Sequence, residues 1–317
     1  MQPDALVRGL HRGDARSVAR AITLVEEGTD QGMAILEKLD RERIDRALVV
    51  GMTGPPGAGK STLSAQLIAQ LRDRDLRVGI VAVDPSSPIS GGAILGDRIR
   101  MMRHALDPEV AVRSMATRGR LGGLCSAAGA AVRIMAASGC RVILLETVGI
   151  GQSEMDIVAL ADITVMVLAP GFGDDIQAMK AGILEVADLL VINKADQPGA
   201  RRLHLDLAAA CRDGDKGGQK ILETVASEGQ GVDELLDRIF LLEEELRQGP
   251  GMRARRARSF ELETLDQALE LLREPLRRRI RDTEGGNRDP RRLAREIVDR
   301  LVGRKPGSTA AGGKHGR

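Results

Sequence analysis

The sequence predicts an α/β fold with a mostly parallel central sheet flanked by helices, an N-terminal helical extension and a C-terminal helical arm. In the middle of the chain, short β-branched runs alternate with helical segments, which is typical of a parallel sheet covered on both faces. Before and after this region, apolar residues recur at three- and four-residue spacing, as in amphipathic helices. We therefore expect a helical extension at residues 1–45, a sheet domain at 46–248, an arm at 249–303 and a disordered tail at 304–317.

The elements follow in order from these patterns. Each of the five β-branched runs ends where a Gly, Asp or Asn begins a loop, so each predicts a strand; they cover residues 47–53, 77–84, 141–147, 163–169 and 189–194. Beyond Gly249-Pro250-Gly251, two helices are expected, from Phe260 to about Arg281 and from Pro290 to Leu301. The first carries a stripe of leucines, which needs a partner surface on the sheet domain or on a second copy of the chain. The stripe consists of Leu262, Leu265, Leu269, Leu272 and Leu276. We expect a homodimer.

The composition excludes several classes of function. The chain has 317 residues with 47 basic and 45 acidic side chains, a net charge of +2 and only 1% aromatic residues, so neither a basic field nor a stacking surface indicates a nucleic-acid partner. The N-terminus is charged and no apolar run approaches the length of a membrane span, so the sequence predicts a cytoplasmic protein without a membrane segment. Three scattered cysteines indicate neither disulfides nor a zinc site.

A phosphate-binding loop is the strongest motif. The first predicted strand leads directly into G-x-x-x-x-G-K-[ST], and a helical segment follows, which is the context that this motif requires. The expected nucleotide-binding residues are Gly54, Pro55, Pro56, Gly57, Ala58, Gly59, Lys60, Ser61 and Thr62. The backbone N–H groups of this loop and the helix N-terminus would bind phosphate oxygens. Lys60 would reach the β- and γ-phosphates, and the Ser61 hydroxyl would ligate Mg²⁺.

A second motif selects the base. The strand at 189–194 ends in Asn193-Lys194-Ala195-Asp196, the N-K-x-D of guanine-nucleotide proteins. The Asp196 carboxylate can accept hydrogen bonds from N1–H and the exocyclic amine of guanine, a donor pair that adenine lacks, so GTP and GDP are the expected nucleotides. Ser227, Glu228 and Gly229 follow another short strand and fit a loop that backs the base.

Acidic residues after other strands are candidate metal ligands. Asp84 and Glu146 each close a strand, and Asp97 lies in a glycine-rich loop. Because a parallel sheet binds its ligand at the carboxyl ends of its strands, these carboxylates can hold Mg²⁺ with Ser61 and orient the attacking water. For any one of them, a solvated cap is the alternative interpretation.

In combination, these segments closely resemble the MeaB/ArgK (MMAA-like) group of methylmalonyl-CoA mutase-associated GTPases. The resemblance rests on GPPGAGKST, VAVDPSSP with GGAILGDRIRM, ETVGIGQSE, APGFGDDIQAMKAGILEVAD and NKAD, and it runs from about residue 15 to 300. It implies a P-loop GTPase of the SIMIBI class with a C-terminal dimerisation arm. It also implies a chaperone that uses GTP to gate adenosylcobalamin loading and to protect an acyl-CoA mutase, with an adenosyltransferase as a further partner.

The resemblance also implies roles for residues at matching positions. Asp84, Asp97 and Glu146 match acidic metal-site and catalytic residues, and residues 147–154 match a second switch. Asp174, Gln177 and Lys180 match a third switch that senses the partner. We expect Lys180 to arrive over the γ-phosphate as an arginine finger does, so that Lys60, Asp97, Glu146 and Lys180 form the catalytic set.

Three other functions are alternatives to this one. A transport ATPase or kinase disagrees with N-K-x-D. A nickel or cobalt metallochaperone GTPase is the main alternative, but it would carry Cys and His motifs near the nucleotide, and here Cys125, Cys140 and Cys211 are isolated. A structural nucleotide-binding scaffold without turnover would require that the candidate carboxylates take no part in catalysis.

Overall fold

The protein is described by a computed structural model. The structure describes residues 3–84, 106–116, 124–147, 159–171, 187–212, 220–282 and 289–301. The chain divides into two compact units, Met1–Thr264 and Leu265–Arg317. None of the helices in these described ranges is both long and apolar enough to cross a lipid bilayer.

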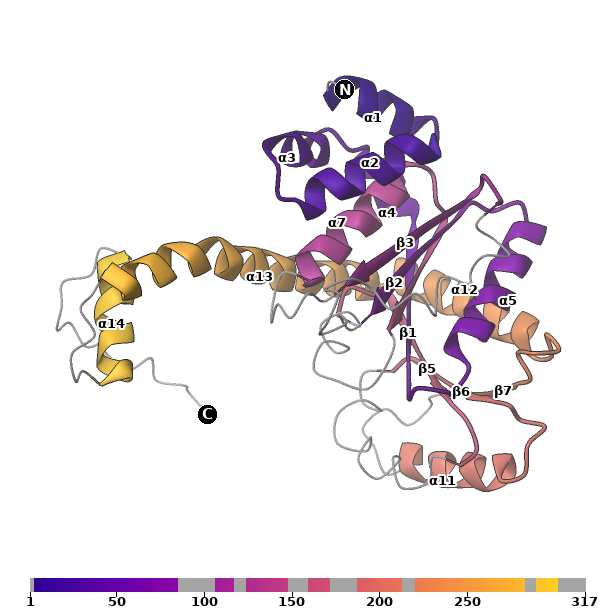
Figure 1. The fold of residues 1–317 in the computed structure, drawn as a ribbon. Helices are drawn as coiled ribbons and strands as arrows, with labels where there is room; N and C mark the ends of the chain where they lie inside the picture. The colour runs from indigo at the N-terminus through magenta and orange to yellow at the C-terminus, as the bar shows by residue number, and fades with distance from the viewer. Residues whose placement is uncertain are drawn as a thin grey trace. The chain divides into compact units, whose positions relative to one another are not determined.

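A seven-stranded sheet forms the centre of the first unit, in the order β3-β2-β4-β1-β5-β6-β7 (Figure 1). The strands are β1 (Leu48–Thr53), β2 (Val78–Asp84), β3 (Val110–Ala116), β4 (Val142–Thr147), β5 (Ile163–Leu168), β6 (Leu189–Asn193) and β7 (Lys220–Thr224). Every neighbouring pair is parallel, which confirms the expected sheet class. The five expected strands all form, and β7 is the short strand expected before the Ser227 loop.

Strand β3 was not predicted, and its position explains why. It lies at the edge of the sheet, where most of its side chains are only half-buried, and Arg113 forms an ion pair with Glu26 of the N-terminal region. A strand of this kind needs no continuous apolar run, so Arg113 and Ser114 interrupt the pattern by which buried strands are recognised.

Helices cover both faces of the sheet. They are α1 (Pro3–His11), α2 (Ala15–Glu26), α3 (Asp30–Glu37), α4 (Arg41–Arg46), α5 (Lys60–Asp73), α7 (Leu124–Ala137), α11 (Ala200–Arg212) and α12 (Val232–Gln248). Apolar residues of α5 and α12 share one core cluster with the sheet, and those of α1, α2, α3 and α7 share a second. Along β5, Val165 and Val167 join the first cluster, whereas Met166 and Leu168 face the opposite side and pack with α11. The strands are therefore buried on both faces, as their apolar runs predict.

Two helices follow the sheet region, α13 (Gly251–Asp282) and α14 (Pro290–Leu301). The expected start of the first at Phe260 is wrong, because the Gly-Pro-Gly sequence does not separate it from the sheet region. Ala254 N–H already donates to the Pro250 carbonyl at 3.0 Å, so helical hydrogen bonding begins at Pro250. A proline is tolerated at the start of a helix, because the first N–H groups of a helix have no partner within it. Met252 is part of the first core cluster, so the beginning of α13 packs with the sheet unit.

Candidate functional site

The phosphate-binding loop lies between β1 and α5 and depends on glycines at both ends. Gly54 has φ +135°, and a Cβ placed there would lie 2.0 Å from the Val167 carbonyl oxygen of β5. Gly59 has φ +92° and directly precedes α5, and its Cβ would lie 2.2 Å from Nδ2 of Asn193. Both positions combine a left-handed backbone with a close approach, so any side chain there would be strained.

Lys60, the first residue of α5, is buried inside this loop. Its Nζ donates to the carbonyl oxygens of Gly54 at 2.6 Å and Pro55 at 3.1 Å. The side chain is therefore directed back over the loop, where backbone N–H groups can converge on an anion. This position places a buried ammonium group against the loop, which is the arrangement that a bound phosphate would need.

Asn193 connects three segments around the loop. Its Nδ2 donates to the Ala58 carbonyl at 2.9 Å, while its Oδ1 accepts from the Thr224 hydroxyl and the Ala226 N–H, both at 3.1 Å. Since the residue is 2% exposed, these three bonds satisfy a buried amide and fix the loops of β6 and β7 against the phosphate loop. Sequence reasoning overlooked Thr224, because a threonine at the end of a strand carries no motif of its own.

Lys194 and the residues after it form the neighbouring rim. Lys194 has φ +57°, and its Nζ donates to the Gly57 carbonyl at 2.8 Å, so its aliphatic stem lies across the entrance of the phosphate loop. Asp196 is exposed, and Ala195 N–H donates to Thr224 O at 3.1 Å. The N-K-x-D loop is thus joined to the end of β7.

The residues Ser227, Glu228 and Gly229 form a tight turn beyond β7. Val225 and Gln230 pair across this turn, and Glu228 N–H donates to Val225 O at 2.9 Å. Because β6 and β7 are adjacent, the turn and Asp196 follow neighbouring strand ends at the same edge of the sheet. An exposed carboxylate beside a preformed turn can receive a planar ligand with two hydrogen-bond donors.

Two of the expected metal ligands are in contact. The Ser61 hydroxyl donates to Oε1 of Glu146, which is 2% exposed at the end of β4. Hydroxyl and carboxylate oxygens are ligands that Mg²⁺ prefers, so this pair fits a magnesium site beside the phosphate loop. Asp84 closes β2, the neighbour of β4, where Val83 is in register with Thr147. Asp97, Asp174, Gln177 and Lys180 lie outside the described residues.

Cysteine and histidine side chains do not gather in the described part of the chain. No group of three or more His, Cys, Asp or Glu that could hold a metal ion occurs among the described residues. Cys140 is buried, and this burial raises the pKa of its thiol to about 11. His204 pairs with Glu223 at 2.7 Å on the surface. The described Cys140 is thus a protonated core thiol at neutral pH.

Comparisons with known proteins give the geometry its context. The family model described as methylmalonyl Co-A mutase-associated GTPase MeaB matches residues 18–282. A Pyrococcus horikoshii protein named as a GTPase is 51% identical over 246 residues, covering 75% of this chain and 77% of its own. The mouse protein named methylmalonic aciduria type A homolog, mitochondrial, is 36% identical over 254 residues, covering 74% of this chain and 61% of its own.

A solved structure agrees with the fold. The crystal structure titled LAO/AO transport system kinase aligns with a TM-score of 0.67 at 23% identity, covering 95% of this chain and 98% of that one. At that identity the likeness concerns the fold alone. The family match covers most of the chain, and it coincides with the phosphate loop, the N-K-x-D loop and the Ser61–Glu146 pair, all at the carboxyl ends of the strands. The chain therefore belongs to the MeaB family of methylmalonyl-CoA mutase-associated GTPases, and it is a GTPase.

Proposed function

We propose that the protein is a chaperone GTPase for an adenosylcobalamin-dependent acyl-CoA mutase similar to methylmalonyl-CoA mutase. It would hydrolyse GTP to GDP and phosphate, gate the loading of the cofactor and protect the mutase from inactivation. The observation that carries this proposal is the family match over residues 18–282, whose description names association with the mutase. The name of the mouse relative points to the same metabolism. A cytoplasmic location and an adenosyltransferase as a second partner belong to the same proposal.

In the proposed site, Ser61, Asp84, Asp97 and Glu146 hold Mg²⁺. The contact between the Ser61 hydroxyl and the Glu146 carboxylate supports this set, because both oxygens lie beside the phosphate loop. Bound Mg²⁺ would neutralise charge that develops on the phosphate oxygens. Lys60 would leave its carbonyl partners for the β- and γ-phosphates, since an ammonium forms stronger hydrogen bonds with phosphate anions than with neutral carbonyls. Asp97 and Glu146 would orient the attacking water.

Guanine recognition is assigned to the rim of the site. Asp196 would accept from N1–H and the exocyclic amine, the Lys194 stem would lie against the base, and the turn at Ser227, Glu228 and Gly229 would back it. The short links between Asn193, Thr224 and Ala226 support this assignment, because they hold both loops in place before a ligand arrives.

Coupling to the mutase is assigned to the segment that follows β5. Gly171, at the start of this segment, has φ +96° with nothing within 4 Å of a Cβ placed there, so its backbone tolerates more than one conformation. Asp174, Gln177 and Lys180 are spaced three apart, which on a helix would bring them near one face. A partner that moves this face could bring Lys180 over the γ-phosphate.

The test is GTP turnover with and without a cobalamin-dependent acyl-CoA mutase from the same organism. The mutase should accelerate GTP turnover by the wild type. Lys180→Ala should lose most of that acceleration, while its affinity for nucleotide stays at the wild-type value. Lys38→Ala, which removes an exposed lysine of the N-terminal extension, is the matched control. Equal acceleration of wild type and Lys180→Ala would remove the segment as the coupling element. No acceleration of either would contradict the chaperone function.

The leucine stripe is assigned to homodimerisation. Leu265, Leu269 and Leu272 of α13 are 56%, 59% and 44% exposed. Leucines alternating at three and four residues are suited to packing against a second helix. A second copy of the chain is the partner that we propose for this stripe.

A further inference from the structure

Two aspartates repeat the same arrangement at the amino end of the sheet. Asp162 directly precedes β5, its N–H donates to Val49 O at 2.8 Å, and its Oδ2 accepts from Val49 N–H at 3.0 Å. Asp188 directly precedes β6, its N–H donates to Thr164 O at 2.9 Å, and its Oδ2 accepts from Thr164 N–H at 2.9 Å. Each carboxylate therefore takes the place of one more residue in the ladder with the neighbouring strand, which is β1 for Asp162 and β5 for Asp188.

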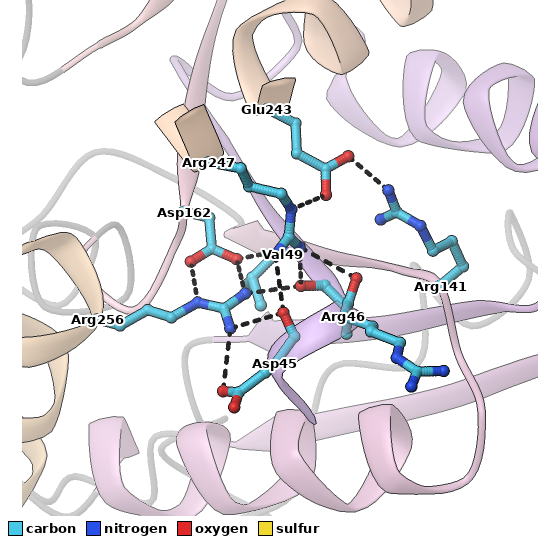
Figure 2. Close-up of polar contacts among 9 residues, drawn as sticks. Asp45, Arg46, Val49, Arg141, Asp162, Glu243, Arg247 and Arg256 are labelled. Atoms are coloured by element: carbon cyan, nitrogen blue, oxygen red, sulfur yellow. Dashed lines mark hydrogen bonds and ion pairs between the residues drawn. The ribbon is translucent and has the colours of Figure 1, made fainter. Parts of the chain in front are cut away.

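Two consecutive arginines of α13, Arg255 and Arg256, bind these two carboxylates, and we call them the arginine pair. Arg255 Nη1 and Nη2 each donate to Asp188 at 2.7 Å. Arg256 Nε and Nη2 donate to Asp162 at 2.9 and 3.0 Å (Figure 2). Both contacts are bidentate, the geometry in which an arginine binds a carboxylate most strongly. The Asp162 and Asp188 side chains are only 4% and 10% exposed, so solvent screens these contacts weakly.

Arginines also bind the backbone that leads into β1. Arg256 donates to the carbonyls of Asp45 at 3.0 Å and Ala47 at 2.7 Å. Arg247 of α12 donates to the same two carbonyls at 2.9 and 3.2 Å and to the carbonyl of Arg46 at 3.1 Å (Figure 2). Burial lowers the pKa of the Arg256 guanidinium, but the hydrogen bond and charge of Asp162, together with the charges of Asp45 and Glu243, more than offset this and raise the pKa above its ordinary value. The amino ends of β1, β5 and β6 thus share one set of arginine contacts.

The same three strands carry the nucleotide loops at their carboxyl ends. The phosphate loop follows β1, the proposed coupling segment follows β5, and Asn193-Lys194-Ala195-Asp196 ends β6. These ends are also close together, because a Cβ placed at Gly54 would lie 2.0 Å from Val167 O, and Asn193 donates to Ala58 O. Strands of five or six residues are about 20 Å long and stiff, since each is hydrogen-bonded on both sides.

We infer that the arginine pair sets the relative positions of β1, β5 and β6, and that it thereby couples the start of α13 to the affinity of the nucleotide site. Within the described ranges, the hydrogen bonds of both arginines lie at the amino ends of the strands, so we treat the two arginines as positioning residues. The inference rests on the guanine-nucleotide binding of the family and concerns regulation of that site. Because coupling between two sites is reciprocal, nucleotide binding should in turn change the stability of the contacts between the arginine pair and the two aspartates.

The experiment uses full-length protein with Arg255→Lys, Arg256→Lys and the double variant. Lysine keeps the charge but cannot bind a carboxylate in the bidentate mode. Arg258→Lys, an exposed arginine of the same helix, is the matched control. GTP and GDP dissociation constants are measured by calorimetry well below the unfolding temperature of each variant, which is determined separately. The double variant should bind nucleotide about five- to tenfold more weakly, the lower end of the common range for coupled sites, and Arg258→Lys should bind as the wild type does.

A purely structural role would give a different result. In that case the variants would unfold at lower temperature, but the folded protein would bind GTP and GDP with wild-type affinity, and this outcome would overturn the inference. If the double variant does not fold, Arg255→Lys alone carries the test, because its carboxylate partner is the more exposed of the two. Failure of the mutase to stimulate turnover would contradict the proposed function and leave this measurement unaffected.

Discussion

At the scale of single residues, the polar groups of the site are satisfied by one another. Lys60 donates to loop carbonyls, the Ser61 hydroxyl donates to Glu146, and Asn193 and Lys194 donate to carbonyls of the phosphate loop. These contacts hold the loop in shape. A nucleotide must exchange some of them for stronger bonds to phosphate, whereas the Asn193 contacts can persist.

Substitutions at different residues of this site should therefore affect nucleotide binding and turnover differently. Lys60→Ala removes a charged donor to phosphate and should weaken GTP binding about 10- to 100-fold, the equivalent of roughly 1.5–3 kcal/mol. Glu146→Gln should retain nucleotide, because it alters the proposed metal site and not the phosphate loop, and it should lower Mg²⁺-dependent turnover about 100-fold. Asp97→Asn should behave likewise. Calorimetry and phosphate release separate the two effects, with the exposed Glu37→Gln as control. Unchanged hydrolysis in both carboxylate variants would contradict the assignment.

Asp196 should determine the choice of base. Asp196→Asn replaces an acceptor by a group that also donates, so GTP binding should fall about 10- to 100-fold and xanthosine triphosphate binding should improve, because xanthine presents an acceptor where guanine has its amine. Titration of wild type and variant with both nucleotides, and with ATP as a reference, measures this change. Equal affinity of the wild type for ATP and GTP would refute the role of Asp196.

At the scale of elements, the N-terminal extension is held by helix caps and close packing. Asp14 caps α2 and accepts from the Ser17 N–H at 2.9 Å and from the Ser17 hydroxyl at 2.6 Å. Gly9 of α1 leaves room for this cap, since a Cβ there would lie 2.2 Å from the Ser17 oxygen. The cap thus contributes to the α1–α2 corner as well as to the helix end.

Asp14→Ala should destabilise the protein by about 1 kcal/mol at pH 7, as the loss of an N-cap commonly does. The hydrogen bonds from Ser17 hold the pKa of Asp14 below its usual 3.8, so the stabilisation is complete above that pH and is lost as pH falls through the lower folded-state value. Denaturant unfolding at pH 7 and near pH 3 should show a smaller difference at the acid pH. A difference independent of pH would argue against the carboxylate as the cap.

At the scale of the whole molecule, the beginning of α13 belongs to the sheet unit, which extends to Thr264. Removal of everything after Gly249 would take away Met252 and the arginine pair and leave Asp162 and Asp188 without their guanidinium partners. Buried carboxylates that lose a partner cost several kcal/mol, on the order of 3–5. A shorter truncation after Thr264 retains these contacts and removes most of the leucine stripe.

This truncation should convert the proposed dimer to a monomer without unfolding the sheet unit. Leu269→Glu with Leu272→Glu should do the same, because two buried charges would be introduced at the proposed interface. Leu271→Glu is the matched control, since this leucine is 67% exposed and lies off the stripe. Light scattering at micromolar concentration measures the mass. A monomeric wild type, or a dimer that survives the truncation, would contradict the proposed interface.

The sequence by itself was sufficient for the sheet class, the phosphate loop and the helices at both ends. The strands are buried on both faces, so each is a continuous apolar run, and the loop glycines lie where only glycine fits. Both features can therefore be predicted from the local sequence. The edge strand β3 and the start of α13 were missed because their polar residues bind partners that are distant in sequence. Arg113 pairs with Glu26, and Arg255 and Arg256 pair with Asp188 and Asp162.

Only the tertiary structure decided which polar residues act together. Asn193 and Thr224 are 31 positions apart, and Ser61 and Glu146 are 85 apart, yet each pair is in contact. Nothing in the local sequence records these distances, because parallel strands bring their ends together through crossovers whose length carries no information about partners. The motifs predict which ligand is bound, and the packing of the sheet determines which side chains contact one another at the site.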